Sequence, residues 1–257
     1  MVVGEGVGVE GSAATWRERF KVRAYEVGAH GVVEAWTLWS WLQETAGKHV
    51  LALGWSIAEL NREGLTWVLA RLHLRVLREA VAEEEVRVTT WPSGAFRLYA
   101  IREFLVEDGG GKTIASATTA WLLVNVATKR PLRLPQAITG LHDEAHGRVI
   151  PDEFRKLPEP KAGGWSRALR VGVSALDVNR HANSTAILTW LIDTLPAEVI
   201  DGRRLGELEV EYRGEALLGD DLTAEASEGG RRGEYLHSLV RASDGRELAR
   251  SVTSWVT

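Results

Sequence analysis

The 257-residue sequence contains no cysteine. This absence excludes disulfides, thiolate metal sites and a cysteine nucleophile, and it leaves the redox character of the compartment open. No apolar run approaches the roughly 18–20 residues that a membrane-spanning helix needs. The net charge of −4 lacks the basic excess typical of nucleic-acid-binding domains. The first fifteen residues have neither a basic stretch nor a long apolar stretch, so we expect a loose tail rather than a targeting peptide, and a cytoplasmic protein.

Hydrophobic residues make up 45% of the chain and charged residues 26%, which predicts a packed core. Tryptophan is abundant, with 11 residues against four Phe and four Tyr. Trp36 and Trp39 belong to a Trp-rich stretch and are spaced to be neighbours on a helix. Such rings either fill a core or form an aromatic wall for an apolar ligand.

Five of the seven prolines lie between residues 131 and 160, where periodicity is weak. This composition predicts a linker between two halves. We therefore expect a flexible tail over 1–15, a first unit over 16–130, a linker over 131–163 and a second unit over 164–257.

The two halves resemble each other in three blocks that occur in the same order. LWSWLQET (38–45) matches ILTWLIDT (187–194) in Trp, Leu and Thr. LVEDGGGKTIASATTAW (105–121) matches LVRASDGRELARSVTSW (239–255) without a gap, and an acidic turn follows a Glu-Ala pair in both 78–86 and 214–222. These matches indicate a duplicated unit.

Each unit is expected to contain a strand, at 19–25 or 166–173, followed by one helix and then antiparallel strands. The first helix is expected over 33–53, with Gly54 at its C′ position. In the second unit Asn183 or Ser184 is the expected N-cap, and Pro196 the expected stop. Apolar and polar residues alternate over 71–76 and 207–212, which predicts half-buried strands. DGGG (108–111) and SDG (243–245) indicate hairpin turns. The predicted fold class is α+β, a double hotdog in which each unit wraps an antiparallel sheet around a long helix.

The stretch LDVNRHANS (176–184) concentrates polar groups directly before the second helix. If the chain is extended there, Asp177, Asn179 and His181 share one face. His181 could act as a general acid or base, Asp177 could orient it or react directly, and Asn179 could polarise a carbonyl oxygen. The alternative is that Asp177 and Asn179 make turn hydrogen bonds and His181 is a surface residue.

Glu215 ends the strand in LEVEYRGEALLGDD (208–221), and its counterpart in the first half is Glu79. The polar cluster has no such counterpart, because Gly28, His30 and Val32 stand opposite Asp177, Asn179 and His181. This asymmetry is typical of a duplicated enzyme with one active site and one half that holds the substrate.

The same residues resemble the motifs of the acyl-ACP thioesterase family. LDVNRHANSTAILTWLID is similar to Asp-x-Asn-x-His-x-Asn-Asn followed by a Trp-bearing helix, and EYRGEA is similar to Glu-Tyr-Arg-x-Glu-Cys. FKVRAYEVG, LQETAGKHVLALG and TWVLARLHLRV resemble the amino-terminal half of those enzymes, so the resemblance spans about residues 20–257. It implies a double hotdog that hydrolyses fatty acyl thioesters of acyl carrier protein in fatty acid biosynthesis.

The resemblance implies that Asp177, Asn179, His181 and Glu215 are catalytic, and that the first half holds the acyl chain, where Trp36 and Trp39 would bind it. The cysteine of the family motif is replaced by Ala216. Two routes remain, namely a water activated by His181 and Glu215, or attack by Asp177 followed by hydrolysis. No cofactor or metal is expected, and HDEAH (142–146) is a weak ligand candidate. Bulky rings in the acyl slot favour short or medium chains.

The implied partner, acyl carrier protein, is acidic, so a basic docking patch is expected. The candidate patches are Lys129, Arg130 and Arg133; Arg203 and Arg204; and Arg231 and Arg232. Because two hotdogs lie in one chain, a monomer or a homodimer is expected. The alternatives are an acyl-CoA thioesterase, a hotdog hydratase or dehydratase, whose motif Asp-x-Asn-Pro-x-His differs in spacing, and an acyl-thioester sensor without turnover.

Overall fold

A computed structural model describes residues 10–12, 14–141 and 146–257. The chain forms two compact units, the first comprising the residues up to 68 together with 77–151, and the second comprising 69–76 together with 152–257. Most of the expected tail, residues 1–9 and 13, lies outside the described residues. Within the described part of the chain, no helix is long and apolar enough to cross a membrane.

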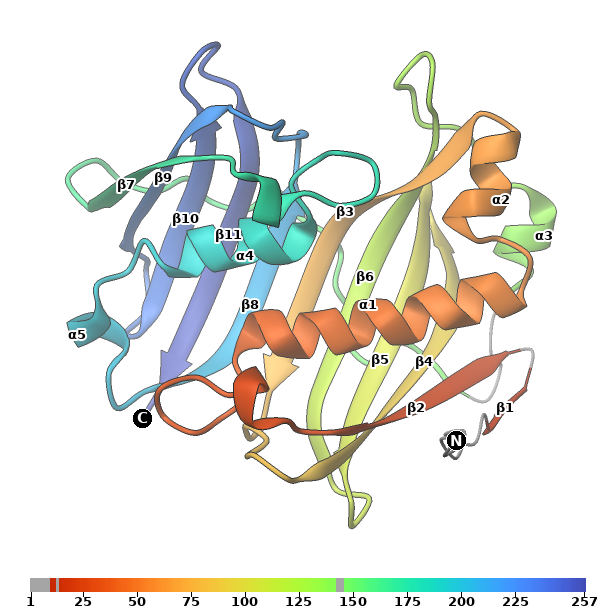
Figure 1. Cartoon of the computed structure of the whole chain (residues 1–257), viewed down its shortest axis with the longest axis horizontal. Helices are drawn as coiled ribbons and strands as arrows, with labels where there is room; N and C mark the ends of the chain where they lie inside the picture. Colours follow the sequence, from red (N-terminus) through yellow and green to blue (C-terminus); the bar gives the residue numbers. More distant parts are fainter. Residues whose placement is uncertain (1–9, 13, 142–145) are drawn as a thin grey trace, which may run out of the picture. The chain divides into compact units, whose positions relative to one another are not determined.

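The first unit is an antiparallel sheet with one long helix lying across it (Figure 1). Its strands follow the spatial order β1-β2-β4-β5-β6. Their bounds are β1 Glu10–Ser12, β2 Thr15–Lys21, β4 Glu85–Phe96, β5 Tyr99–Asp108 and β6 Thr113–Asn125. Helix α1, Ala35–Ala52, packs on β2 and β4. The shorter helical segments are η1 Ala24–Glu26, α2 Ile57–Arg62 and α3 Gln136–Thr139.

The second unit repeats this plan with a shorter helix. Its strands follow the order β3-β8-β11-β10-β9-β7, and β3 joins it from Leu69 onward. The bounds are β3 Leu65–Val76, β7 Trp165–Arg170, β8 Arg204–Tyr212, β9 Asp221–Glu228, β10 Glu234–Arg241 and β11 Glu247–Val256. Helix α4, Ser184–Ile192, packs on β9 and β10, and the short segments are η2 Val173–Ala175 and α5 Ala197–Ile200. Each unit is a hotdog, which confirms the predicted fold class.

Helix α1 begins and ends close to the predicted bounds. Its buried face includes Trp39 and Leu42, both 0% exposed, so apolar burial holds it on the sheet. Gly54 follows the helix with φ +75 and donates its N–H to the carbonyl of Leu51, as expected of a C′ glycine. Helix α4 ends at Ile192, earlier than the predicted stop, and Pro196 instead caps the start of α5.

Asn183 is the N-cap of α4, and its Oδ1 accepts the N–H of Ala186 at 2.7 Å. Asn183→Ala is expected to lower the free energy of unfolding by about 1 kcal/mol, because that helical N–H loses its acceptor. Urea unfolding followed by circular dichroism measures this. The matched control is Glu34→Ala at the N-cap of α1, where no side-chain cap bond exists. Equal losses in the two variants would show that the cap bond contributes nothing.

The internal repeat extends to individual backbone hydrogen bonds. Within each unit the same N–H groups and carbonyls pair at equivalent positions. In the first unit the N–H groups of Gly28, Val33 and Val22 donate to the carbonyls of Val32, Ala80 and Glu84, respectively. In the second unit the equivalent N–H groups of Asp177, Ala182 and Val171 donate to the carbonyls of His181, Ala216 and Asp220. The two helices also share a threonine that bonds back to the carbonyl of a tryptophan, Thr45 to Trp41 and Thr194 to Trp190. The duplication read from sequence is therefore present in the fold.

One part of the sequence alignment of the two halves is wrong. Val106 pairs with Ala115 in the first unit, whereas Leu239 pairs with Ala249 in the second. The turn between β10 and β11, residues 241–246, is one residue longer than the turn at 108–112. The structural counterpart of Val106 is thus Leu239 rather than Val240, because strand pairing rather than side-chain identity sets the register.

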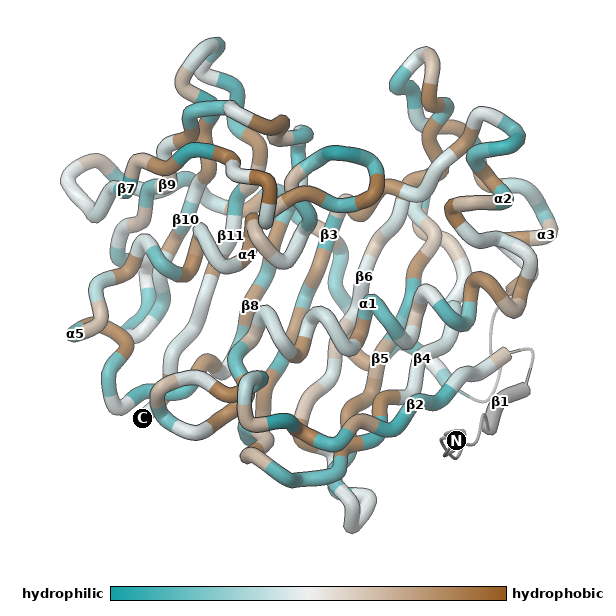
Figure 2. The backbone as a smooth tube through the Cα atoms, in the orientation of Figure 1, coloured by the Kyte–Doolittle hydropathy of each residue, from teal (hydrophilic) through white to brown (hydrophobic). Residues whose placement is uncertain are grey.

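Two strand predictions are also corrected. The strands expected at 19–25 and 166–173 end at Lys21 and Arg170, and the chain then forms η1 and η2. The strand over 71–76 is not half-buried, although residues alternate in hydropathy along the strands (Figure 2). Leu72 and Leu74 are buried as predicted, but so is His73, at 6% exposure. The second face of β3 is covered by the segment that contains Asp152.

His73 is held between two carboxylates. Its Nδ1 lies 2.9 Å from Asp152 Oδ2 and its Nε2 lies 2.8 Å from Glu207 Oε1. On the same strand, Arg71 forms an ion pair with Glu211, and Arg75 forms one with Glu207. Glu209 on β8 is the residue opposite His73 in the strand pairing. A ring with a carboxylate at each nitrogen fits the imidazolium form, which donates at both. Burial alone would lower the pKa of His73, but the hydrogen bonds to Asp152 and Glu207 outweigh it and raise the pKa.

Stability is therefore expected to fall as the solution becomes alkaline. Because the folded-state pKa of His73 is raised, its contribution is fully present below the unfolded pKa of about 6.5 and is lost as pH rises through the folded pKa. Urea unfolding across this range should show a steeper decline in wild type than in His73→Gln, because burial raises the pKa of Glu209 and that carboxyl contributes a slope to both proteins. The lowered pKa values of Asp152 and Glu207 act in the acid range and do not interfere. An identical pH slope in both proteins would contradict the assignment to His73.

Candidate active site

The polar loop before α4 is a tight turn rather than an extended segment. Asp177 Oδ1 accepts the backbone N–H groups of Asn179 at 2.8 Å and His181 at 3.2 Å. The N–H of Asp177 in turn donates to the carbonyl of His181, and Arg180 adopts φ +63. The expectation that three side chains share one extended face is wrong. The hydrogen bonds of Asp177 are those expected if this stretch is only a turn. His181, however, is not an isolated surface residue.

His181 is brought to Glu215 by backbone pairing. The N–H of Ala182 donates to the carbonyl of Ala216 at 2.8 Å, and His181 and Leu217 form an isolated antiparallel bridge. Across this junction His181 Nε2 lies 3.6 Å from Glu215 Oε2, an ion-pair distance longer than a hydrogen bond. The side chains are 27% and 47% exposed, so both are open to solvent. A histidine and a carboxylate in contact at the surface form a pair able to move a proton.

Two residues that were not singled out from the sequence support this arrangement. Tyr212 donates its hydroxyl to the carbonyl of Ser184 at 3.3 Å, which ties β8 to the first turn of α4, and burial raises its pKa. Arg241 lies 3.3 Å from Asp220 Oδ2 and donates to the carbonyl of Glu215 at 3.4 Å. Tyr212 belongs to the EYR motif, but nothing in the sequence signals Arg241, which lies 26 residues from Glu215.

The equivalent loop of the first unit has the same backbone without the same side chains. Gly28 and Val32 stand where Asp177 and His181 stand, and they make the same backbone bond. A Cβ atom on Gly28 would lie 1.9 Å from Glu34 Oε1, so the position of an aspartate side chain is occupied. An aspartate at this position would therefore require the Glu34 side chain to move.

Comparison with known proteins identifies the family. The family model described as the acyl-ACP thioesterase N-terminal domain matches residues 13–141, and the C-terminal domain model matches residues 159–257. The chain belongs to the acyl-ACP thioesterase family. The palmitoyl-acyl carrier protein thioesterase of Cuphea hookeriana chloroplasts is 30% identical over 256 residues, which cover 93% of this chain and 62% of that protein. The chain thus spans less than two thirds of the length of this curated relative.

Two solved structures of this family have the same fold. An acyl-ACP thioesterase from Bacteroides thetaiotaomicron is 26% identical with a TM-score of 0.83, and the match covers 94% of this chain and 97% of that one. The 12:0-ACP thioesterase from Umbellularia californica is 24% identical with a TM-score of 0.85, covering 96% of this chain and 98% of that one. Both matches extend over both hotdogs.

Ala216 occupies the position of the cysteine in the family motif. Its side chain is 0% exposed, and its carbonyl accepts the N–H of Ala182. The residue next to Glu215 therefore points into the core of the second unit and not toward the surface where His181 and Glu215 meet.

The predicted acyl-binding tryptophans lie in the first unit. Trp39 is fully buried on the inner face of α1, whereas Trp36 is half-buried. Their role in binding an acyl chain remains a prediction.

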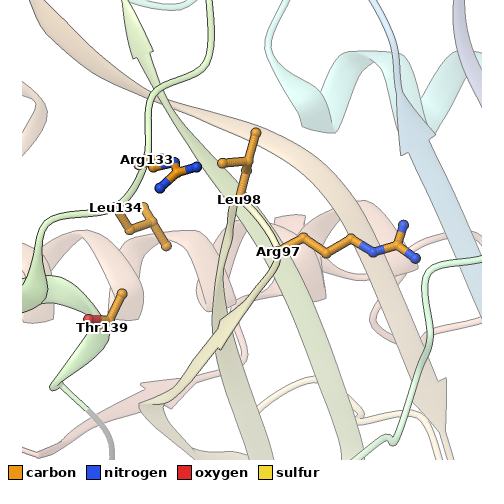
Figure 3. Close-up of a pocket in the computed structure, with 5 residues that line it drawn as sticks. All are labelled: Arg97, Leu98, Arg133, Leu134 and Thr139. Atoms are coloured by element: carbon orange, nitrogen blue, oxygen red, sulfur yellow. The ribbon is translucent and has the colours of Figure 1, made fainter.

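The first unit also has a pocket of about 470 Å³, lined by Arg97, Leu98, Arg133, Leu134 and Thr139. Figure 3 shows Arg133 and Leu134 near Leu98, whereas the guanidinium of Arg97 extends away from them. Arg133 thus lies at a surface hollow, which agrees with its place among the candidate docking residues.

The other candidate docking arginines differ in how freely they could meet a partner. Arg203 donates to the hydroxyl of Tyr235 at 3.0 Å, and Arg204 donates to the carbonyl of Val76. Those two guanidinium groups are engaged inside the second unit. The Arg231 side chain is 88% exposed and lies 3.9 Å from Glu234.

One group of side chains in the described residues could hold a metal ion. Ligand atoms of His73, Asp152 and Glu209 lie within 4.8 Å of one another. Both nitrogens of His73 already face carboxylates, so an ion would have to displace one of the two protons that the imidazolium donates to them. Residues 142–145 of the HDEAH stretch lie outside the described residues.

Proposed function

We propose that the chain hydrolyses the thioester of fatty acyl-ACP and releases a free fatty acid. The observation that carries this proposal is the contact of His181 with Glu215, at 3.6 Å, in the unit whose loop carries Asp177, Asn179 and His181. Family membership supports the same activity, and the acyl-ACP thioesterase from Bacteroides has the same fold along nearly its whole length.

The mechanism that fits this geometry uses water as the nucleophile. Water attacks the thioester carbonyl while His181 takes its proton, and Glu215 stabilises the imidazolium that forms. The tetrahedral oxyanion accepts a hydrogen bond from the Asn179 amide. The intermediate collapses by breaking the C–S bond, and His181 returns the proton to the departing thiolate. The products are a fatty acid and the free thiol of the carrier.

Asp177 is proposed as the residue that shapes this loop rather than as the nucleophile. One of its carboxylate oxygens already accepts two backbone N–H groups, from Asn179 and His181. An oxygen whose lone pairs already accept two hydrogen bonds is a weaker nucleophile. Holding the loop fixes the position from which His181 meets Glu215.

The acyl chain is proposed to lie in the first unit, bound in part by Trp36 and Trp39. Each buried CH₂ contributes about 0.8 kcal/mol, so the length of the apolar slot selects the chain. The bulk of the two indoles favours short or medium chains. Hydrolysis rates on acyl-ACPs of increasing length should peak below sixteen carbons, whereas a preference for sixteen or eighteen carbons would contradict a shortened slot.

The test of the activity is a direct assay of the purified chain on acyl-ACP and acyl-CoA of matched lengths. The proposal expects fatty acid release from acyl-ACP, with kcat/KM higher than for acyl-CoA. Turnover of acyl-CoA alone would assign the chain to a different carrier, and hydration of an enoyl substrate would replace hydrolysis altogether. A cytoplasmic location and a monomeric or homodimeric state remain predictions, checked by fractionation and light scattering.

A further inference from the structure

Four exposed apolar side chains lie on the segments that carry or adjoin His181 and Glu215 in the second unit. Val173 is 75% exposed, Val178 90%, Leu217 44% and Leu218 56%. We refer to these four residues as the apolar rim. Exposed apolar side chains grouped in this way mark interaction surfaces, because each would be more stable covered than in water.

The three segments that carry the apolar rim are hydrogen-bonded to one another. The N–H of Gly219 donates to the carbonyl of Val171 at 3.0 Å, which joins the turn after Glu215 to the segment before Val173. The N–H of Asn183 donates to the carbonyl of Ala175 at 2.8 Å, and Leu217 bridges His181. The rim is therefore fixed relative to the site rather than carried on independent loops.

The internal repeat shows that the apolar rim belongs to the copy with the reactive residues. The counterparts of Val173, Val178, Leu217 and Leu218 in the first unit are Ala24, Ala29, Val81 and Ala82. The second copy has the larger apolar side chain at every one of these positions. At one neighbouring position the first unit has the larger side chain, Tyr25 opposite Ser174. The Tyr25 hydroxyl, however, accepts a hydrogen bond from Arg23 at 2.8 Å.

Two arginines lie close to the site residues along the chain or in the fold: Arg180 directly precedes His181, and Arg246 donates to the carbonyl of Arg213, two residues before Glu215. Arg180 lies in the loop that carries His181 and adopts φ +63. Arg246 lies beside Gly214, because a Cβ atom added to that glycine would be 3.3 Å from Arg246 Nε. Among the residues that the structure describes, neither arginine forms an ion pair with a carboxylate. An apolar surface bordered by unpaired cations is complementary to an acidic partner with apolar contacts at its centre.

We propose that the apolar rim, with Arg180 and Arg246, is the docking surface for the acyl carrier protein. This inference rests on the proposed function. His181 and Glu215 are open to solvent, so the protein that delivers the thioester must approach across the residues around them. The acidic carrier pairs with the two arginines, and its apolar surface covers the rim.

The test compares Leu217→Ser with its counterpart Val81→Ser. The two residues make equivalent bridges and are 44% and 48% exposed, so the substitutions perturb the two units to a similar degree. For acyl-ACP, Leu217→Ser should raise KM about tenfold and leave kcat within about twofold, whereas Val81→Ser should change neither. Val173→Ser, which lies outside the site loop, should repeat the effect.

The same variants are assayed on acyl-N-acetylcysteamine, a thioester without a carrier. Unchanged kcat/KM on this substrate, together with the raised KM on acyl-ACP, supports docking. Equal losses on both substrates would overturn the proposal, because the rim would then serve the chemistry. An unchanged KM for acyl-ACP in Leu217→Ser and Val173→Ser would also overturn it.

Carrier binding is measured separately from turnover, by fluorescence anisotropy with labelled apo-ACP. Weaker binding to Leu217→Ser than to Val81→Ser supports the docking surface even if wild type hydrolyses neither thioester. In that case the proposed function would fail while the docking surface stands. Equal binding to wild type and to both variants would overturn the docking surface, whatever the activity.

Discussion

His181→Ala is expected to lower kcat/KM for acyl-ACP by about 10²–10⁴-fold, the usual cost of removing a general base. The imidazole is partly exposed and its one ion-pair partner in the described residues is Glu215, so its loss leaves no cavity in the core. The unfolding midpoint in urea should therefore stay close to that of wild type. Steady-state hydrolysis and urea unfolding on the same preparation separate a catalytic effect from a structural one.

His30→Ala is the matched control, because His30 lies in the equivalent loop of the first unit. We expect this variant to keep kcat/KM within about twofold of wild type. If His181→Ala kept wild-type activity, the imidazole would have no part in the reaction. Similar losses in both variants would point to a general effect of altering either loop.

Asp177→Ala is expected to reduce activity about 100-fold, because the N–H groups of Asn179 and His181 lose their acceptor and the turn loses its shape. Asp177→Asn keeps an acceptor oxygen at the same position. This second variant should therefore retain activity within about tenfold of wild type. Both values come from steady-state hydrolysis of acyl-ACP.

The contrast between the two substitutions separates a loop-shaping role from a nucleophilic one. An amide cannot form the acyl-enzyme anhydride that a nucleophilic Asp177 would require. If Asp177→Asn were as inactive as Asp177→Ala, attack by Asp177 would replace the water route. Single turnover in H₂¹⁸O gives an independent check, because label in Asp177 itself would also identify it as the nucleophile.

The main helix and the site could be predicted because their signals are local. The apolar positions of α1 and the glycine that follows it define its bounds, and Asn183 precedes α4 as a capping residue must. The motifs around His181 and Glu215 singled out two residues that lie 3.6 Å apart in the structure. The internal repeat further indicated that the second unit carries the polar cluster before its helix and that the first unit does not.

The corrected features have different causes, and one of them depends on a contact that is remote in sequence. His73 is buried because Asp152, 79 residues away, covers the second face of its strand. The loop at Asp177 is a turn because one carboxylate oxygen accepts two amides and Arg180 takes a positive φ. The one-residue shift of β10 follows from turn length and strand pairing. The contact of His73 has no local signal, whereas the turn at Asp177 was one of two structures that the local sequence allowed.

The most direct test of the account compares Glu215→Gln with Glu79→Gln in fatty acid release from acyl-ACP. The two glutamates precede equivalent alanines whose carbonyls accept equivalent N–H groups, but Glu215 lies 3.6 Å from His181, whereas Val32 stands at the position of that histidine in the first unit. The account predicts a loss of at least about 100-fold for Glu215→Gln and a change within about twofold for Glu79→Gln. Full activity of Glu215→Gln, or equal losses in both variants, would contradict it.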